Sequence, residues 1–364
     1  MNFYESTLDQ LRHEANFRVI PPDSAGEATV DLSGNDYLAI AADAAMKNDF
    51  FNSLGAEIPP LSASASRLLA AGQKEFETLE HTLADLYGAP ALLFNSGYHA
   101  NSGAIAALAK GRTLIVADKL VHASIIDGMM LSKAQFERFR HNDTTHLRKI
   151  LDRRASEFDR VLIVCESVYS MDGDTAPLDE IIEAKTPNSL LYVDEAHAFG
   201  VCGRDGLGLT ADRPEVDITV GTLGKAAGSV GAFAICRRSE LRDYLINTAR
   251  SLIFSTAIPP LSCAWSRYVV ERIPSMDDRR KRLRELSCTL ADILGTPQPS
   301  HIQPLIVGSS AAAIAMSDRL RRNGFKVLPI RTPTVPPGTE RLRFSLSADL
   351  TPDRLKTLAD ALKQ

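Results

Sequence analysis

Short apolar segments alternate with helix-like segments between residues 74 and 236, and this alternation limits the possible folds most strongly. The apolar segments are Ala91–Phe94, Thr113–Val116, Arg160–Cys165, Leu190–Val193, Ile218–Val220 and Ala232–Cys236. Strands without alternating polar positions are buried on both faces, which is typical of a parallel sheet covered by helices. The pattern therefore predicts an α/β fold with a mostly parallel sheet flanked by helices.

The segments between these strands predict helices and one further strand. We expect helices at Lys74–Tyr87, Tyr98–Leu108, His122–Ser132 and Thr144–Arg154, and a strand at Arg138–Asn142. Ahead of them, Ser6–Arg18 predicts an amphipathic helix that Pro21–Pro22 ends, followed by an extended piece, Thr29–Leu38.

The pattern changes after Ser239. Helices are expected at Glu240–Ser251 and from Pro260 into the basic run Arg279–Arg284, which we expect to form a solvated helix face. Strands and helices then follow in the order β-α-β-β-α, at Ile302–Val307, Ala311–Asn323, Lys326–Ile330, Arg341–Ser347 and from Thr351. We therefore predict an N-terminal helix and arm at residues 1–45, a large α/β domain at 46–240 and a smaller C-terminal α+β domain at 241–364.

Composition excludes several classes of function. A net charge of −4, without a basic cluster interleaved with aromatic residues, argues against nucleic-acid binding. No apolar run approaches the roughly 18 residues needed to span a bilayer, and the N-terminus shows no export signal. The five scattered cysteines indicate free thiols in a reducing cytoplasm.

Polar residues follow the predicted strands where each strand ends. In open parallel sheets, ligands bind beyond these carboxyl ends. The residues found there are Ser96, Gly97, His122, Asp194, His197 and Lys225. Each has an ordinary explanation, such as a helix cap, a core histidine or a lysine that reaches solvent.

Together these residues meet the needs of pyridoxal 5′-phosphate (PLP). Its aldehyde needs a lysine, its pyridine nitrogen needs a carboxylate, and its phosphate needs a helix N-terminus. Other phosphate-binding loops are missing from the sequence, and no third ligand accompanies Asp194 and His197 to form a zinc site. The loop Glu166–Asp174 does not match a calcium loop, so no metal is expected.

Several motifs resemble the α-oxoamine synthases, a family of fold-type I PLP enzymes. They are Leu32–Leu38, Asn95–Asn101, Asp118–Ser124, Ser170–Asp174, Asp194–His197, Thr222–Lys225 and Phe254–Ala257, and the resemblance runs from about Asn16 to Leu362. The segment Thr332–Arg343 is most similar to the members that act in biotin biosynthesis on L-alanine and a pimeloyl thioester, carried by coenzyme A or an acyl carrier protein.

The resemblance implies a role for each matching residue. Lys225 would bond the cofactor and move protons at the substrate Cα, Asp194 would pair with the pyridine nitrogen, and His197 would bond the ring hydroxyl. His122 would stack on the ring. The residues that would seat or neighbour the cofactor are Ser96, Gly97, Tyr98, Ser170 and Thr222.

The resemblance also implies substrate and subunit contacts. Arg343 would clamp the amino-acid carboxylate with help from Asn35, and Arg18 would bind the distal carboxylate of the acyl substrate. Ser255 or Thr256 would reach the phosphate in the neighbouring subunit of a homodimer. One departure lies in the run Leu61–Gly72, including Ala70–Ala71, and at Phe76, where the family has a histidine.

Other functions stay open at this point. Within the family, the chain could resemble glycine C-acetyltransferase, 5-aminolevulinate synthase or serine palmitoyltransferase in its substrates. Outside it, a fold-type I aminotransferase or a catalytically silent regulatory subunit is an alternative.

Overall fold

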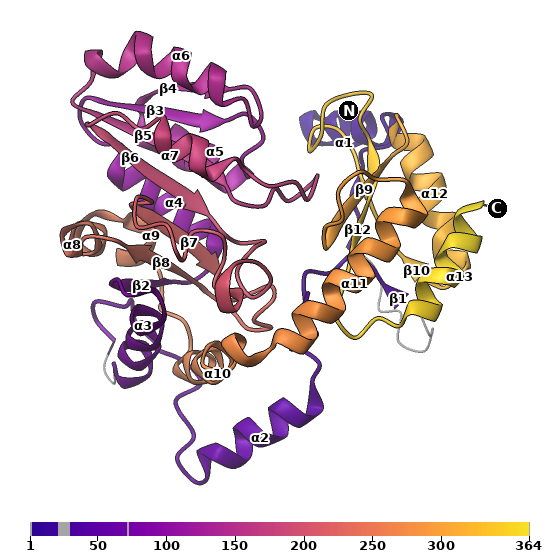
Figure 1. The fold of residues 1–364 in the computed structure, drawn as a ribbon, viewed down its shortest axis with the longest axis horizontal. Coiled ribbons are helices and arrows are strands. Elements are labelled where there is room, and N and C mark those ends of the chain that lie inside the picture. Colours follow the sequence, from indigo (N-terminus) through magenta and orange to yellow (C-terminus); the bar gives the residue numbers. More distant parts are fainter. Residues whose placement is uncertain (1, 21–29, 71–72, 364) are drawn as a thin grey trace. The chain divides into compact units, whose positions relative to one another are not determined.

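A computed structural model describes residues 2–20, 30–70 and 73–363 of the chain. The described residues form two compact units (Figure 1). The sheet unit comprises Leu38–Tyr169 and Thr175–Arg280, and the C-terminal unit comprises the described parts of Met1–Tyr37, Ser170–Asp174 and Lys281–Gln364. The predicted stop at Pro21–Pro22, the start of the arm at Thr29 and the pair Ala71–Gly72 lie outside the described residues.

The sheet unit is built on a seven-stranded sheet of order β2-β8-β7-β6-β5-β3-β4. Its strands are β2 (Ala91–Phe94), β3 (Thr113–Asp118), β4 (Gln135–Phe139), β5 (Arg160–Glu166), β6 (Ser189–Asp194), β7 (Ile218–Thr222) and β8 (Ala232–Cys236). Of these seven strands, β8 alone runs opposite to the other six, so the prediction of a mostly parallel sheet is confirmed.

Helices cover both faces of this sheet because its strands are apolar on both sides (Figure 1). One face packs against α4 (Gly97–Leu108), α5 (Ala123–Ser132), α8 (Ser239–Thr248) and α9 (Arg250–Ile253). The other packs against α6 (Thr144–Arg154) and α7 (Leu178–Glu183). The unit also contains α2 (Ala44–Leu54), α3 (Lys74–Tyr87) and α10 (Pro260–Val270), and α3 packs on α10 and β2.

The register of the parallel strands brings their carboxyl ends to one edge. Glu166, the last residue of β5, pairs with Asp194, the last residue of β6. Asp194 in turn pairs with Val220 of β7. Residues that follow these strands therefore lie along the same rim of the sheet.

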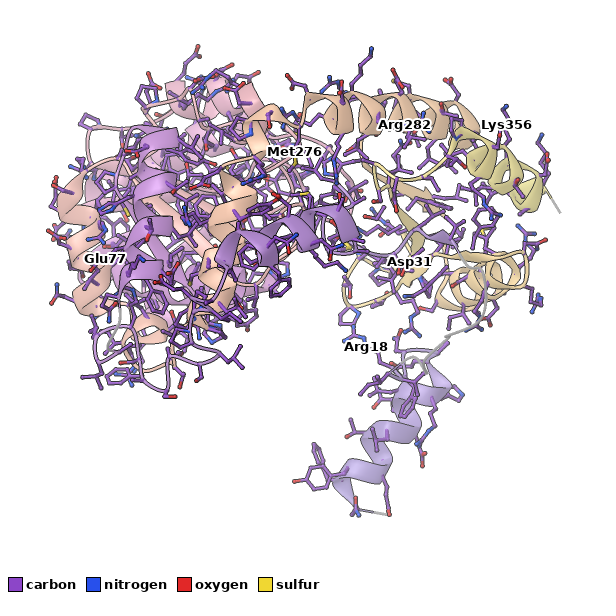
Figure 2. The ribbon with its side chains drawn as sticks, turned by 90° about the horizontal axis from the view of Figure 1, so that it is seen from below. Arg18, Asp31, Glu77, Met276, Arg282 and Lys356 are labelled. Atoms are coloured by element: carbon purple, nitrogen blue, oxygen red, sulfur yellow. The ribbon has the colours of Figure 1, made fainter. Side chains whose placement is uncertain are left out.

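The C-terminal unit contains two small sheets. Its elements are α1 (Phe3–His13), β1 (Val30–Asp31), most of α11 (Asp277–Leu294), β9 (Ile302–Ile306), α12 (Ser310–Arg322), β10 (Phe325–Lys326), β11 (Leu328–Ile330), β12 (Arg341–Ser345) and α13 (Pro352–Lys363). The strands β11, β12 and β9 form an antiparallel sheet, and β1 pairs with β10 in parallel. On α11, Arg282 donates to the Leu350 carbonyl at 3.2 Å, and α13 carries Lys356 (Figure 2).

The observed division of the chain differs from the predicted boundaries. Residues 241–280 belong to the sheet unit because Leu241, Leu245 and Leu252 of α8 and α9 pack into its core. The arm up to Tyr37 belongs to the C-terminal unit, where the Ser345 N–H donates to the Leu32 carbonyl at 2.8 Å. Sequence order therefore does not separate the two units.

Several predicted elements are corrected by the structure. The helix expected from Pro260 into the basic run is two helices, α10 and α11, because the 3₁₀ turn Ile273–Ser275 with Pro274 interrupts it. The basic run is not a purely solvated face, since the Arg280 side chain is buried and donates to the Ile273 carbonyl at 2.6 Å. The strand expected at Arg138–Asn142 is β4, which lies three residues earlier.

Other differences concern elements with weak sequence signals. The first helix ends at His13 instead of Arg18, and none of the described residues of α1 is buried, so its apolar stripe does not pack on its own chain. Sequence reasoning missed α2 and the short α7. All five cysteines are free thiols, as expected. Among the described residues, no helix has both the length and the apolar character needed to cross a membrane.

Gly173 gives a prediction about the stability of the C-terminal unit. It has φ +71°, and a Cβ atom at this position would lie 1.9 Å from the Ile302 carbonyl oxygen. Since both the backbone conformation and this backbone contact oppose a side chain, we expect Gly173→Ala to destabilise the protein by at least about 2 kcal/mol. Thermal unfolding should show a lower midpoint, whereas Gly34→Ala, with open space around the added Cβ, should leave it nearly unchanged.

Candidate functional site

Lys225 lies in the loop that follows β7. The last residue of β7, Thr222, shapes this loop because its hydroxyl accepts the Gly224 N–H and donates to the Gly231 carbonyl, both at 3.2 Å. Lys225 is half-buried, and its Nζ lies 2.7 Å from Nε2 of His197. The amine is therefore held against an imidazole, which disfavours the simple explanation of a lysine that reaches into solvent.

Asp194 ends β6 and is almost completely buried. Its Oδ2 accepts a hydrogen bond from Asn101 Nδ2 at 2.6 Å, and its Oδ1 accepts the Ala196 N–H at 2.8 Å. A buried carboxylate is costly unless such donors, or a positive charge, compensate its lost hydration. His197, also buried, follows it in the turn after β6.

His122 is the N-cap residue of α5. Its Nδ1 lies 2.7 Å from the Ser124 hydroxyl and accepts the Ser124 N–H at 3.2 Å. Loss of water around the ring lowers the pKa of His122, and the charge of Asp194 acts in the opposite direction. The capping role expected as the ordinary explanation is thus real.

The start of α4 forms a second part of the rim. Ser96 is its N-cap, and Gly97 and Tyr98 are the first helical residues, whose N–H groups have no partner within a helix. A Cβ atom on Gly97 would lie 3.8 Å from the Thr222 side chain, so the helix start faces the end of β7. The Tyr98 hydroxyl donates to Asp127, which raises the pKa of Tyr98.

Ser255 and Thr256 lie near the same helix start within a single chain. The Thr256 carbonyl accepts a hydrogen bond from the Asn95 side chain, and Thr256 forms an isolated bridge with Ser66. Their assignment to the phosphate of a neighbouring subunit stays a prediction.

Four other predicted site residues, Ser170, Asn35, Arg343 and Arg18, belong to the C-terminal unit. The guanidinium of Arg343 is buried, with Nε donating to the Ser170 carbonyl at 2.6 Å and Nη2 to Asn35 Oδ1 at 3.1 Å. Asn35 therefore orients Arg343. Arg18 lies beyond the end of α1 (Figure 2), and its Nη2 is 3.5 Å from the Thr334 hydroxyl.

Phe76, which replaces a family histidine, is a core residue in α3. Its ring is buried, and the guanidinium of Arg67 lies 4.7 Å from the ring centroid. The substitution therefore adds packing in the sheet unit.

Two polar residues at the rim received no role from the sequence. Asn101 in α4 contacts Asp194, and Glu166 at the end of β5 is buried with an Oε1 atom that has no partner among the described residues. Burial, and next the charge of Asp194, raise the pKa of Glu166 well above its usual value. One signal could have identified Asn101: it is a strongly polar residue in a helix of small and apolar residues, where burial requires a partner.

Comparison with known proteins supports the family suggested by these residues. Residues 28–362 match the model of the aminotransferase class I and II family. A provisionally named 8-amino-7-oxononanoate synthase of Pasteurella multocida is 44% identical over 96% of this chain and 95% of its own. One from Neisseria meningitidis is 43% identical over the whole of both chains.

The chain belongs to the aminotransferase class I and II family. Within it, the chain is an α-oxoamine synthase. Among solved structures it is similar to a serine palmitoyltransferase of S. paucimobilis with bound PLP, at 28% identity, a TM-score of 0.87 and coverage of 99% and 96% of the two chains. It is also similar to the 8-amino-7-oxononanoate synthase of Francisella tularensis, at 29% identity, a TM-score of 0.77 and coverage of 94% and 97%.

This membership confirms several predictions made from the sequence. The fold is the fold-type I architecture, the cofactor is PLP, and the protein is a PLP-dependent C-acyltransferase. The alternative of a catalytically silent subunit is therefore set aside.

The residues of the rim fit PLP in their chemistry. Asp194 can neutralise a protonated ring nitrogen, Lys225 supplies an amine, and the start of α4 offers N–H groups to a phosphate. Because Gly97 has no side chain, none extends from this position into the space between the start of α4 and the end of β7. The assignment of each residue to a part of the cofactor is a proposal.

Proposed function

We propose that this α-oxoamine synthase condenses L-alanine with a pimeloyl thioester. The products would be an α-amino ketone, carbon dioxide and the free thiol, as in biotin biosynthesis. The cofactor chemistry rests above all on the contact of Lys225 Nζ with His197 Nε2 at 2.7 Å, at the rim where Asp194 ends β6. The names of relatives at 43–44% identity support this choice of substrates.

Each proposed role follows from what the side chain can do. When bound, PLP supplies the electron sink that stabilises negative charge at the substrate Cα. Lys225 would take and return the Cα proton, since its amine is held in place by His197. Asp194 would supply the negative charge opposite the pyridine nitrogen, and His122 would stack on the ring.

The remaining rim and substrate residues would bind rather than react. Ser96, Gly97 and Tyr98 would hold the phosphate at the start of α4, and Ser170 and Thr222 would be polar neighbours of the cofactor. In the C-terminal unit, Arg343 would bind the amino-acid carboxylate, because Asn35 and the Ser170 carbonyl fix its guanidinium plane.

A pair of arginines in the C-terminal unit supports an acyl substrate with a distal carboxylate. Burial, and next the charge of Arg18, lower the pKa of Arg331, so the two guanidinium groups influence each other. No described carboxylate lies within ion-pair distance of either. Two like charges and the Thr334 hydroxyl beside Arg18 would therefore suit an anionic group such as the end of a pimeloyl chain.

We also propose that the enzyme is a homodimer whose sites include Ser255 or Thr256 of the second subunit. In support, the sheet unit exposes large apolar side chains near this segment. Some are close to it in sequence, and others are close in sequence to Ser66, which forms an isolated bridge with Thr256. They are Leu61, Leu68, Leu69 and Phe254, which are between 50% and 80% exposed.

A substrate matrix tests the proposed reaction. Glycine, alanine and serine would be crossed with acetyl, succinyl, pimeloyl and palmitoyl thioesters, and pimeloyl would be offered on both coenzyme A and an acyl carrier protein. We expect alanine with pimeloyl to give the highest kcat/KM. Preference for serine with palmitoyl would contradict the proposal and support a serine palmitoyltransferase, the activity of one structural neighbour.

The arginine pair gives a prediction about substrate specificity. Arg331→Gln and Arg18→Gln should each raise KM for the pimeloyl thioester by about 10-fold or more, since a charged hydrogen bond is lost. A heptanoyl thioester has the same chain length without the carboxylate, so its KM should hardly change. Equal losses with both thioesters would show that the arginines act on the fold instead.

A further inference from the structure

A buried network of hydrogen bonds connects two residues that are proposed to contact the cofactor ring. The Tyr192 hydroxyl donates to Asn101 Oδ1 at 2.7 Å. Asn101 Nδ2 donates to Asp194 Oδ2 at 2.6 Å and to the Ser124 hydroxyl oxygen at 2.9 Å. That hydroxyl lies 2.7 Å from His122 Nδ1. Tyr192, Asn101 and Ser124 are each at most 1% exposed, so solvent does not complete these bonds.

The partners of Asn101 determine the orientation of its amide group. An ionised carboxylate only accepts, so the amide nitrogen of Asn101, not its oxygen, must face Asp194. The amide oxygen then faces Tyr192, whose hydroxyl donates to it. The second amide hydrogen goes to the Ser124 oxygen. The Ser124 backbone N–H donates to His122 Nδ1 at 3.2 Å, which makes Nδ1 an acceptor, so the Ser124 hydroxyl hydrogen also points to it.

This direction determines the protonation of His122. Its Nδ1 accepts from both the hydroxyl and the backbone N–H of Ser124, so the ring hydrogen lies on Nε2 and the ring is neutral. A proton on Nδ1 would face the Ser124 N–H, which also needs an acceptor, and would force the hydroxyl hydrogen to turn away from the ring.

Charges around the ring act in both directions. Asp194 on β6 and Asp127 on α5 favour a protonated ring, whereas burial and the charge of Lys225 after β7 oppose it. Glu166 at the end of β5 also faces this region, and burial, followed by the charge of Asp194, raises its pKa. The net effect lowers the pKa of His122, in agreement with the hydrogen-bond directions.

We propose that Asn101 is a positioning residue for the cofactor. Asn101 fixes the carboxylate of Asp194 and, through Ser124, keeps the His122 ring neutral and oriented. The proposal deepens the proposed function and rests on the roles given there to Asp194 and His122. A neutral stacking ring matters because a protonated one would place a second positive charge beside a protonated pyridine nitrogen, which would weaken its pairing with Asp194.

The first readout is the protonation state of His122. In the full-length protein with ¹⁵N-labelled histidine, NMR would follow the His122 ring from about pH 6 to 8, with its signal assigned by its loss in His122→Gln. The wild type should show the neutral ring with hydrogen on Nε2 throughout. In Ser124→Ala, which deletes one oxygen, and in Asn101→Leu, the His122 pKa should rise by about one unit or the second tautomer should appear.

The second readout is the affinity for the cofactor, measured by absorbance and fluorescence titration of PLP. Asn101→Leu should raise Kd about 10-fold or more because Asp194 loses its donor, whereas Ser124→Ala should change Kd less than about 3-fold. Ser189→Ala removes a buried hydroxyl at the opposite end of β6, where it bonds to Thr186, and should change neither readout.

Each outcome decides the proposal. If Ser124→Ala leaves the His122 signal as in the wild type, the connection to His122 is refuted. If folded Asn101→Leu binds PLP like the wild type, the positioning of Asp194 is refuted; should it fail to fold, Asn101→Ser with the same readouts takes its place. No substrate is used, so failure of the alanine and pimeloyl assay would leave these results unaffected.

Discussion

Lys225→Ala is expected to lower kcat by at least about 10⁴-fold, since one change removes both the proposed covalent anchor of the cofactor and the proposed base at Cα. The contact of Lys225 Nζ with His197 Nε2 holds this amine at the rim, and an alanine in its place offers no group that could replace it. Steady-state product formation with the preferred substrates measures this loss.

Covalent trapping provides an independent check of the same residue. Borohydride reduction followed by intact-protein mass spectrometry should show the mass of PLP on the wild-type chain and none on the variant. Lys149→Ala, which removes an exposed lysine of α6, should retain both the activity and the added mass. Persistence of the added mass in Lys225→Ala would show that another amine carries the cofactor.

Asp194→Asn is expected to lower kcat by roughly 10²–10³-fold, because it removes the charge proposed to pair with the ring nitrogen while keeping the shape of the side chain. The amide keeps only one oxygen, so it can accept from Asn101 or from the Ala196 N–H but not from both, and the unfolding midpoint should also fall. A fall in kcat that is much larger than the fall caused by a change at another buried acid would therefore report the lost charge.

The neighbouring acid is a matched control for Asp194. Glu195 is fully buried but accepts from the Ser167 hydroxyl at 2.6 Å and from the Thr210 N–H at 2.7 Å, so it holds a loop. Glu195→Gln should lower the unfolding midpoint and leave kcat within about 3-fold. If Glu195→Gln and Asp194→Asn affect kcat equally, the effect of Asp194 is not specific to the cofactor.

Strong local signals were predicted well. The helix α3 begins and ends where its apolar periodicity and Gly88 indicate, and Gly88 adopts the left-handed conformation expected of a helix stop. The apolar strands β2, β5, β6 and β7 were also located, because full burial requires an unbroken apolar run. Weaker signals were missed. The helix α2, which buries only Phe50, was not predicted, and one continuous helix was predicted where a turn with Pro274 separates two helices.

The candidate site was predicted in its main residues but not in its connections. The sequence placed Lys225, Asp194, His197 and His122 at strand ends, and parallel strands bring such ends to one edge. It could not show that Asn101 joins Asp194 to Ser124, since these residues lie far apart along the chain and meet only when α4 packs on the sheet.

The sequence by itself determined the class of fold, the cofactor and the family, because apolar runs and short motifs act locally. Only the tertiary structure decided which unit each segment joins, such as Ser170–Asp174 with the C-terminal unit, and which donors face Asp194. Hydrogen-bond direction and burial depend on neighbours brought together by packing. The protonation of His122 is therefore a property of the folded chain and not of its motif.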